Sequence, residues 1–167
     1  QLVKNAGIDA RSTRREELIK RVSKAIGSQL DWELVLQHAV NELGRYLAVS
    51  RCYIILTHKE DLTNNIIFEY RAKDINPLTG STFPIKNNPG LAEALSSSEI
   101  VMFVEAQSEE LLRPMEDFLK TNNVRSTLYH LVATTGDKRA FLCLDQCDRT
   151  RTWTEDEHNL VVTISQE

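Results

Sequence analysis

Hydrophobic positions in this chain recur with two periods, and the helical period is clearest over residues 32–47. Apolar side chains return there every three or four residues: Trp32, Val35, Leu36, Ala39, Val40, Leu43 and Leu47. This spacing predicts an amphipathic helix with one buried face. Thr13 and Glu16 have the spacing of a capping box and predict an earlier helix that ends near Gly27. Thr154 and Glu157 repeat that signature and predict a helix that runs toward the end of the chain.

Short apolar segments bounded by turn residues predict five strands: Arg51–Thr57, Ile66–Arg71, Ile100–Val104, Val124–Ala133 and Ala140–Leu144. Asn88 and Pro89 have the pattern of a helix start, and a further short helix is expected to begin at Pro114. The order of elements is two helices, two strands, a helix, a strand, a helix, two strands and a helix. It predicts an α+β domain, an antiparallel sheet with helices on its faces.

Composition and charge then exclude several classes of protein. The content of 41% hydrophobic and 26% charged residues is typical of a soluble globular chain. A net charge of -4 gives no reason to expect nucleic acid or an anionic membrane as a partner. No apolar run approaches the roughly 20 residues of a membrane span. The three cysteines are an odd number without disulfide spacing, which favours a reducing, cytoplasmic setting.

The domain limits also follow from the pattern. Residues 1–12 show no periodicity and are expected to be a linker, and residues 13–167 form one domain. The chain begins at Gln1, and its helical pattern still runs at Glu167. We therefore expect a piece of a longer protein.

No catalytic arrangement and no metal site are expected from the motifs. Cys143 and Cys147 could form a redox pair or half of a metal site, which Cys52 could extend to an iron–sulfur site. Free cysteine is also a common core residue, and zinc would need a second pair of ligands nearby. A structural role for the three thiols is therefore favoured. His130 follows Tyr129 in an apolar strand, which indicates a histidine in the core or at the edge of a pocket.

Two segments of the chain resemble GAF domains. FPIKNNPGLAEALSSSEIVMFVE is similar to the segment in which a Phe/Ile-Pro strand leads into a short Gly-Leu-Ala helix and a strand ending in an acid. Glu105 stands there in place of the usual aspartate. VRSTLYHLV and RAFLCLDQCDRTRTWTEDE are similar to the closing strands of GAF domains in cyanobacterial phytochrome-like sensors and sensor histidine kinases. Gln146, Cys147, Arg151 and Trp153 fit that pattern, and the resemblance extends over residues 13–167.

The resemblance implies terminal helices on one face of the sheet and a pocket under short helices and loops on the other. Such pockets hold a bilin, a cyclic nucleotide or another small molecule. The candidates for lining it here are Phe103, Met115, Phe118, Tyr129 and His130.

Bilin-binding members carry a cysteine, usually followed by histidine, in the helix before the Val-Arg strand, and EELLRPMEDFLKTNNVRS has neither. The Asn-Lys-Phe-Asp-Glu signature of cyclic-nucleotide binders is also missing. We therefore expect no covalent bilin and no cofactor, with an unidentified small ligand left open.

The resemblance further implies a non-catalytic sensory domain of a multidomain signalling protein. A sensor histidine kinase of a two-component system is the expected parent, with its flanking signalling domains as partners. The alternatives are a non-covalent small-ligand or redox sensor and, last, a methionine sulfoxide reductase of the GAF fold, whose cysteine spacing is not matched.

Family members commonly pair through their terminal helices, so we expect a homodimer. The candidates form two apolar stripes: Leu18, Val22 and Ile26, and Leu160, Val161 and Ile164. The same stripes could instead cover the domain's own sheet.

Overall fold

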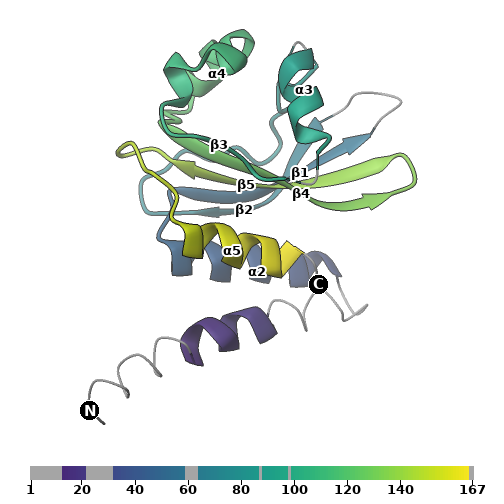
Figure 1. Cartoon of the computed structure of the whole chain (residues 1–167), viewed down its shortest axis with the longest axis vertical. Helices are drawn as coiled ribbons and strands as arrows, with labels where there is room; N and C mark the ends of the chain where they lie inside the picture. Colours follow the sequence, from purple (N-terminus) through teal and green to yellow (C-terminus); the bar gives the residue numbers. More distant parts are fainter. Residues whose placement is uncertain (1–12, 22–31, 59–63, 87, 98, 166–167) are drawn as a thin grey trace.

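A five-stranded antiparallel sheet divides the molecule into two layers (Figure 1). In spatial order the strands are β2 (Asn64–Arg71), β1 (Arg51–His58), β5 (Lys138–Gln146), β4 (Ser126–Thr135) and β3 (Val101–Phe103). This computed structural model describes residues 13–21, 32–58, 64–86, 88–97 and 99–165. The linker expected over residues 1–12 lies outside the described residues, as do Gly27 and the turn after β1.

Two long helices, α2 (Trp32–Leu47) and α5 (Glu155–Ser165), cover one face of the sheet (Figure 1). The other face carries α3 (Pro89–Leu95), the 3₁₀ segments η1 (Ala106–Ser108) and η2 (Glu110–Met115), and α4 (Glu116–Thr121). The predicted α+β architecture is confirmed. None of the described helices is both long and apolar enough to cross a membrane.

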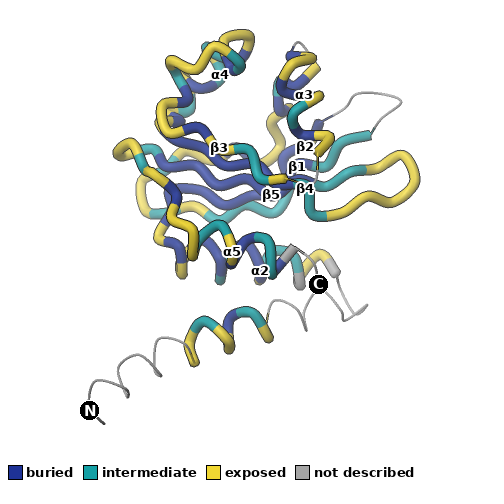
Figure 2. Tube along the Cα trace, viewed as in Figure 1, coloured by how far each residue is buried: buried dark blue, intermediate teal, exposed yellow. Residues whose placement is uncertain are grey.

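Alternating side chains give the sheet two apolar faces and hence two cores. Figure 2 shows that the central strands between these cores are largely buried. The helix-side core lies under α2 and α5, and its central-strand members are Cys52, Ile54, Leu128, Leu142 and Leu144. The loop-side core lies under α3, η2 and α4, and its strand members are Tyr53, Ile55, Ile66, Phe103, Tyr129, Phe141 and Cys143. Consecutive residues of β5 therefore serve opposite cores, because side chains alternate between the two faces along a strand.

The capping box predicted for the last helix is confirmed. The backbone N–H of Glu157 donates to the Thr154 hydroxyl at 3.1 Å, and the N–H of Thr154 donates to the Glu157 carboxylate at 2.9 Å. Glu157 also pairs with Arg151, whose guanidinium lies 4.7 Å from the centre of the Trp153 ring. The start of α5 is thus fixed to the chain that leaves β5.

The helix predicted to begin at Pro114 is the main error of the sequence-based assignment. The regular helix α4 begins at Glu116, and Pro114 lies inside the preceding 3₁₀ segment η2. In a 3₁₀ turn an N–H at position 114 would donate to the carbonyl of Leu111, which accepts instead from the Asn88 side chain at 2.8 Å, so proline leaves no unpaired acceptor there.

A bulge in β2 shapes the long connection between β2 and α3. The register of β1 and β2 shifts between Tyr53 and Ile54, and Phe68 adopts a left-handed φ of 48° at this point. The carboxylate of Glu69, the next residue, accepts hydrogen bonds from the N–H of Leu78 at 2.8 Å and the Thr79 hydroxyl at 3.2 Å. The connection is therefore held against the sheet.

The outer edge of β2 is covered by the chain itself. The N–H of Ile66 donates to the carbonyl of Ser81 at 3.2 Å, and the N–H of Phe83 donates to that of Asn64 at 2.8 Å. The Gln37 side chain on α2 donates to the carbonyl of Glu69 at 3.0 Å.

Gly44 brings α2 close to the sheet, which gives a first prediction. A Cβ atom at this position would overlap the ring of Tyr70 on β2. Gly44→Ala should therefore destabilise the fold by about 1–3 kcal/mol, although alanine favours helix more than glycine does. Urea unfolding measures the change. A Gly44→Ala, Tyr70→Ala double variant should lose much less stability than the sum of the two single changes, and additivity would contradict the overlap.

Candidate functional site

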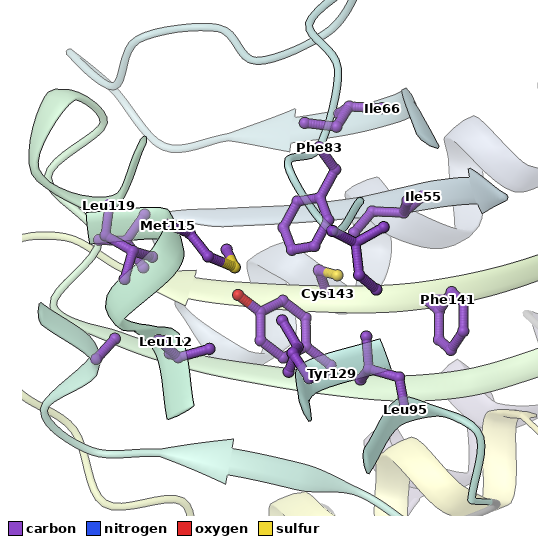
Figure 3. Close-up of a cluster of buried hydrophobic side chains, with 14 of the residues drawn as sticks. Ile55, Ile66, Phe83, Leu95, Leu112, Met115, Leu119, Tyr129, Phe141 and Cys143 are labelled. Carbon is purple, nitrogen blue, oxygen red and sulfur yellow. The ribbon is translucent and has the colours of Figure 1, made fainter. Parts of the chain in front are cut away.

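The loop-side core is the candidate site, because sequence resemblance places a pocket on this face of the sheet. Figure 3 shows side chains from the sheet, among them Ile55, Tyr129 and Cys143, facing side chains from η2 and α4 such as Leu112, Met115 and Leu119. The layer between them is apolar apart from the tyrosine hydroxyls and one thiol. Its composition suits a large ligand with an apolar body.

Four of the five predicted pocket residues lie in this layer. Phe103, Met115 and Tyr129 are buried in the loop-side core, and Phe118 packs against it. Phe83, which the sequence did not single out, lies at the centre of an aromatic group: its ring is 5.6 Å from those of both Phe118 and Tyr129, edge to face. The Tyr129 ring is also 6.4 Å from that of Phe103.

The fifth predicted residue, His130, lies on the opposite face. It follows Tyr129 in β4 and therefore points toward α5, in register with Leu142 of the helix-side core. Burial lowers the pKa of His130, and the nearby His158 of α5 lowers it further. Its Nδ1 atom has no hydrogen-bond partner within the described part of the chain. His130 does not line the candidate site.

A buried polar row closes one end of the loop-side layer. Arg51, Asp145 and Thr127 are adjacent across β1, β5 and β4, and each is at most 1% exposed. The Thr127 hydroxyl donates to Asp145 Oδ1 at 2.9 Å, and the Tyr53 hydroxyl reaches the same oxygen at 3.5 Å. Arg51 Nη1 lies 3.5 Å from Asp145 Oδ2. Sequence reasoning missed this row, although Asp145 shares the inward face of β5 with Phe141 and Cys143.

Burial dominates the electrostatics of this row. It raises the pKa of Asp145 to about 6, while the charge of Arg51 and the hydrogen bonds from Thr127 and Tyr53 oppose the rise. Burial, and then the charge of Asp145, also raises the pKa of Tyr53, Tyr129 and Cys143. The hydroxyls and the thiol therefore stay protonated at neutral pH.

The three cysteines lie in different surroundings. Cys52 belongs to the helix-side core and Cys143 to the loop-side core, so they occupy opposite faces of the sheet. Cys147 lies beyond the end of β5, with its sulfur 3.4 Å from Arg51 Nη1. Burial raises the pKa of Cys147 to about 11. Within the described residues no three His, Cys, Asp or Glu side chains group as a metal site would require.

The loop-side layer is closed to solvent in this structure. Leu91 of α3 and Leu112 and Met115 of η2 are at most 1% exposed. A ligand would therefore reach the sheet only if α3 or the η2–α4 segment moved outward.

The two apolar stripes predicted to form a dimer interface are at least partly buried in the domain's own core. Leu18, Leu160, Val161 and Ile164 are buried in the helix-side core, and Val22 and Ile26 lie outside the described residues. The stripe on α5 therefore covers the domain's own sheet, which was the alternative interpretation.

Two long helices on one face of an antiparallel sheet, and short helices over an apolar layer on the other, define a small domain of the α+β class. The family model of the GAF domain matches residues 31–167, and the chain belongs to that family. GAF domains are in general sensory domains without catalysis of their own. No curated protein matches the chain.

Several solved structures that share this fold hold a bilin. The phycocyanobilin-bound GAF domain of a cyanobacterial phytochrome has 19% identity and a TM-score of 0.76, and the match covers 91% of this chain and 90% of that one. The phycoerythrobilin-bound GAF domain of a cyanobacterial phytochrome has 18% identity and a TM-score of 0.75, with 91% and 92% covered. A far-red absorbing dark state with bound biliverdin has 19% identity and a TM-score of 0.74, with 89% and 93% covered.

These matches contradict the prediction that the domain carries no cofactor, because the similar structures hold bilins. The prediction rested on the missing cysteine in the segment before β4. That absence bears only on a covalent bond, since a ligand can also be held by packing and hydrogen bonds alone.

The burial of the thiols gives a second prediction. Cys52 and Cys143 should not react with iodoacetamide in the folded protein, because both are 0% exposed and burial raises the pKa of each. Cys147 is partly exposed and should react first, although slowly. Mass spectrometry of peptides locates the label, and labelling in urea is the control. Rapid labelling of Cys143 in the folded chain would contradict this packing.

Proposed function

We propose that this GAF domain is the sensory module of a signal-transduction protein and binds a bilin without a covalent bond. The observation that carries the proposal is the similarity to bilin-bound GAF domains over about nine-tenths of the chain. The aromatic group in the loop-side layer supports it, because a bilin is a long conjugated molecule that needs apolar and aromatic surface.

The residues of the chain would bind and shield such a ligand. Phe83, Phe118 and Tyr129 supply aromatic surface, and η2 and α4 keep water out. When bound, the bilin itself supplies absorption of visible light. The Tyr129 hydroxyl remains protonated at neutral pH and can donate a hydrogen bond to one of its polar atoms.

The thiols of the chain support non-covalent binding. The residues of η2 and α4 contain no cysteine. Cys143 is the thiol of the loop-side core, and its raised pKa leaves little of the reactive thiolate. We therefore expect the bilin to separate from the polypeptide on denaturation.

Co-expression with the enzymes that make biliverdin or phycocyanobilin provides the test. The purified domain should carry a visible absorption band in a ratio near one bilin per chain. On a denaturing gel stained with zinc, the band of the protein should not fluoresce. A colourless folded protein with both bilins would overturn the proposal, and a fluorescent protein band would overturn its non-covalent part.

A matched pair of variants locates the site. Phe118→Glu places a charge in the loop-side layer and should reduce the bilin content at least about tenfold, because a buried charge without a partner is costly. Met102→Glu places the same charge on a side chain that is 42% exposed on β3 and should leave the bilin content unchanged. Circular dichroism confirms that both variants are folded. Equal loss in both would contradict the placement.

We further propose that the parent protein is a sensor histidine kinase in which two copies pair through their terminal helices. The helix of residues 13–21, α2 and α5 lie on the side of the sheet opposite the candidate site (Figure 1). Leu34 on α2 is 68% exposed and can contribute to such an interface, whereas the stripe on α5 is already covered.

Sedimentation tests this assembly. The wild-type chain should be a dimer at concentrations of about 100 μM, and Leu34→Glu should shift it toward monomer, because a charge would be buried at the interface. Glu33→Gln, next to it on α2, is the control and should keep the dimer. A wild-type chain that remains monomeric would overturn the pairing.

A further inference from the structure

Arg51 joins three separate parts of the structure. Its Nε donates to the carbonyl of Asn76 at 3.1 Å, and its Nη1 donates to the carbonyl of Asn122 at 3.0 Å. Asn76 lies in the connection from β2 to α3, and Asn122 is the residue after α4. The side chain stands on β1 and is 1% exposed. One guanidinium on the sheet therefore binds two segments that cover the loop-side layer, the connection from β2 to α3 and the end of α4.

Both segments held by Arg51 carry residues of the candidate site. The connection from β2 to α3 contributes Leu78 and Phe83 to the loop-side core, and η2 with α4 contributes Met115 and Leu119. A ligand can enter this layer only when its cover moves outward, and both segments are part of that cover. The hydrogen bonds of Arg51 resist that movement directly.

Asp145 supplies the opposite charge beneath Arg51. The two residues are in register across β1 and β5, with 3.5 Å between Nη1 and Oδ2. Thr127 and Tyr53 hold the other carboxylate oxygen. A guanidinium this deeply buried needs such a partner, because removal of a charge from water is costly.

We propose that Arg51, with Asp145 as its counter-charge, is the positioning residue that holds the loop-side layer closed. Release of its two carbonyl contacts loosens the end of α4 and the part of the connection from β2 to α3 around Asn76, whereas Glu69 still holds Leu78 and Thr79. The closing role stands on the contacts alone, whereas control of ligand entry rests on the proposed function as well.

Asp145 also makes the closure of the loop-side layer depend on pH in a defined direction. Its pKa is about 6 when the layer is closed and returns toward the ordinary value of 3.8 when water reaches the carboxyl. The closed form therefore binds the proton more tightly, because burial costs the carboxylate more than its attraction to Arg51 returns. The extra stability of the closed form is present below pH 4 and is lost as the pH rises through 6. The titratable or charged groups around Asp145 are Arg51, Tyr53, Tyr129, Cys52, Cys143 and Cys147. Burial raises the pKa of the phenols and thiols above the neutral range, so Asp145 titrates there without them.

Hydrogen exchange without any bilin tests the closing role. Arg51→Lys keeps the positive charge but cannot reach both carbonyls, and it should speed exchange of the amide of Asn122 by roughly tenfold or more. Arg71→Lys is the matched control. Arg71 is the neighbour of Arg51 on β2, donates to the carbonyl of Ile75 at 3.0 Å and is about half exposed. This change should leave the amide of Asn122 unaffected. Wild-type exchange at the amide of Asn122 in folded Arg51→Lys would overturn the proposal.

The wild-type chain gives a second measurement that needs no variant at Arg51. After correction for intrinsic exchange, opening at Asn122 should increase between pH 5 and pH 7. Asp145→Asn should show the same opening at both values, since it has no proton to lose. Opening in the wild type that is constant or falls over this range would overturn the role of Asp145.

The rate of bilin uptake tests separately whether Arg51 controls ligand entry. Arg51→Lys should take up biliverdin faster than the wild type does, at equal protein concentration. An unchanged uptake rate with faster exchange would overturn control of entry but not the closing role. Absence of bilin binding in the wild type would overturn the proposed function and leave the exchange result intact.

Discussion

Burial of both faces of the central strands is the constraint on which the structure depends. β1 and β5 lie in the middle of the sheet, so every residue of their inner stretches must face one apolar core or the other. Helices α2 and α5 meet this need on one side with long, regular surfaces. On the other side the cover comes from short segments and their connections, which must be held to the sheet by additional hydrogen bonds. Glu69 on β2 and Arg51 on β1 provide such hydrogen bonds.

The two layers therefore differ in how they are stabilised. The helix-side core depends on packing of continuous apolar stripes, and changes there act mainly through lost burial. The loop-side layer depends in addition on a few hydrogen bonds from buried polar groups to backbone carbonyls. A buried ion pair adds little net stability, but removal of one partner leaves a charge uncompensated. Such a layer has a small number of sites at which its closure can be controlled.

Local patterns in the sequence predicted the elements well. The stripe over residues 32–47 and the capping box of Thr154 and Glu157 depend on neighbours along the chain, and the structure confirms both. The 3₁₀ segment before α4 was missed because a proline can start a helix or lie within a tight turn. The polar row was missed because Arg51, Thr127 and Asp145 are brought together only by strand register. The placement of His130 beside Tyr129 in the pocket was wrong because adjacent residues of a strand face opposite sides of the sheet. The expectation of no cofactor failed because a missing thiol excludes only covalent attachment.

The covered edge of β2 has a consequence for aggregation. A sheet can act as a template for a growing fibre only if both of its edges accept a further strand. Residues 80–83 and the Gln37 side chain already engage the edge of β2, and the other edge strand, β3, is three residues long. Strand addition could proceed from one side alone and would stop after a single pairing. The sheet is therefore protected against open-ended polymerisation by its own connection, even though Met102 and Val104 leave apolar surface beside β3.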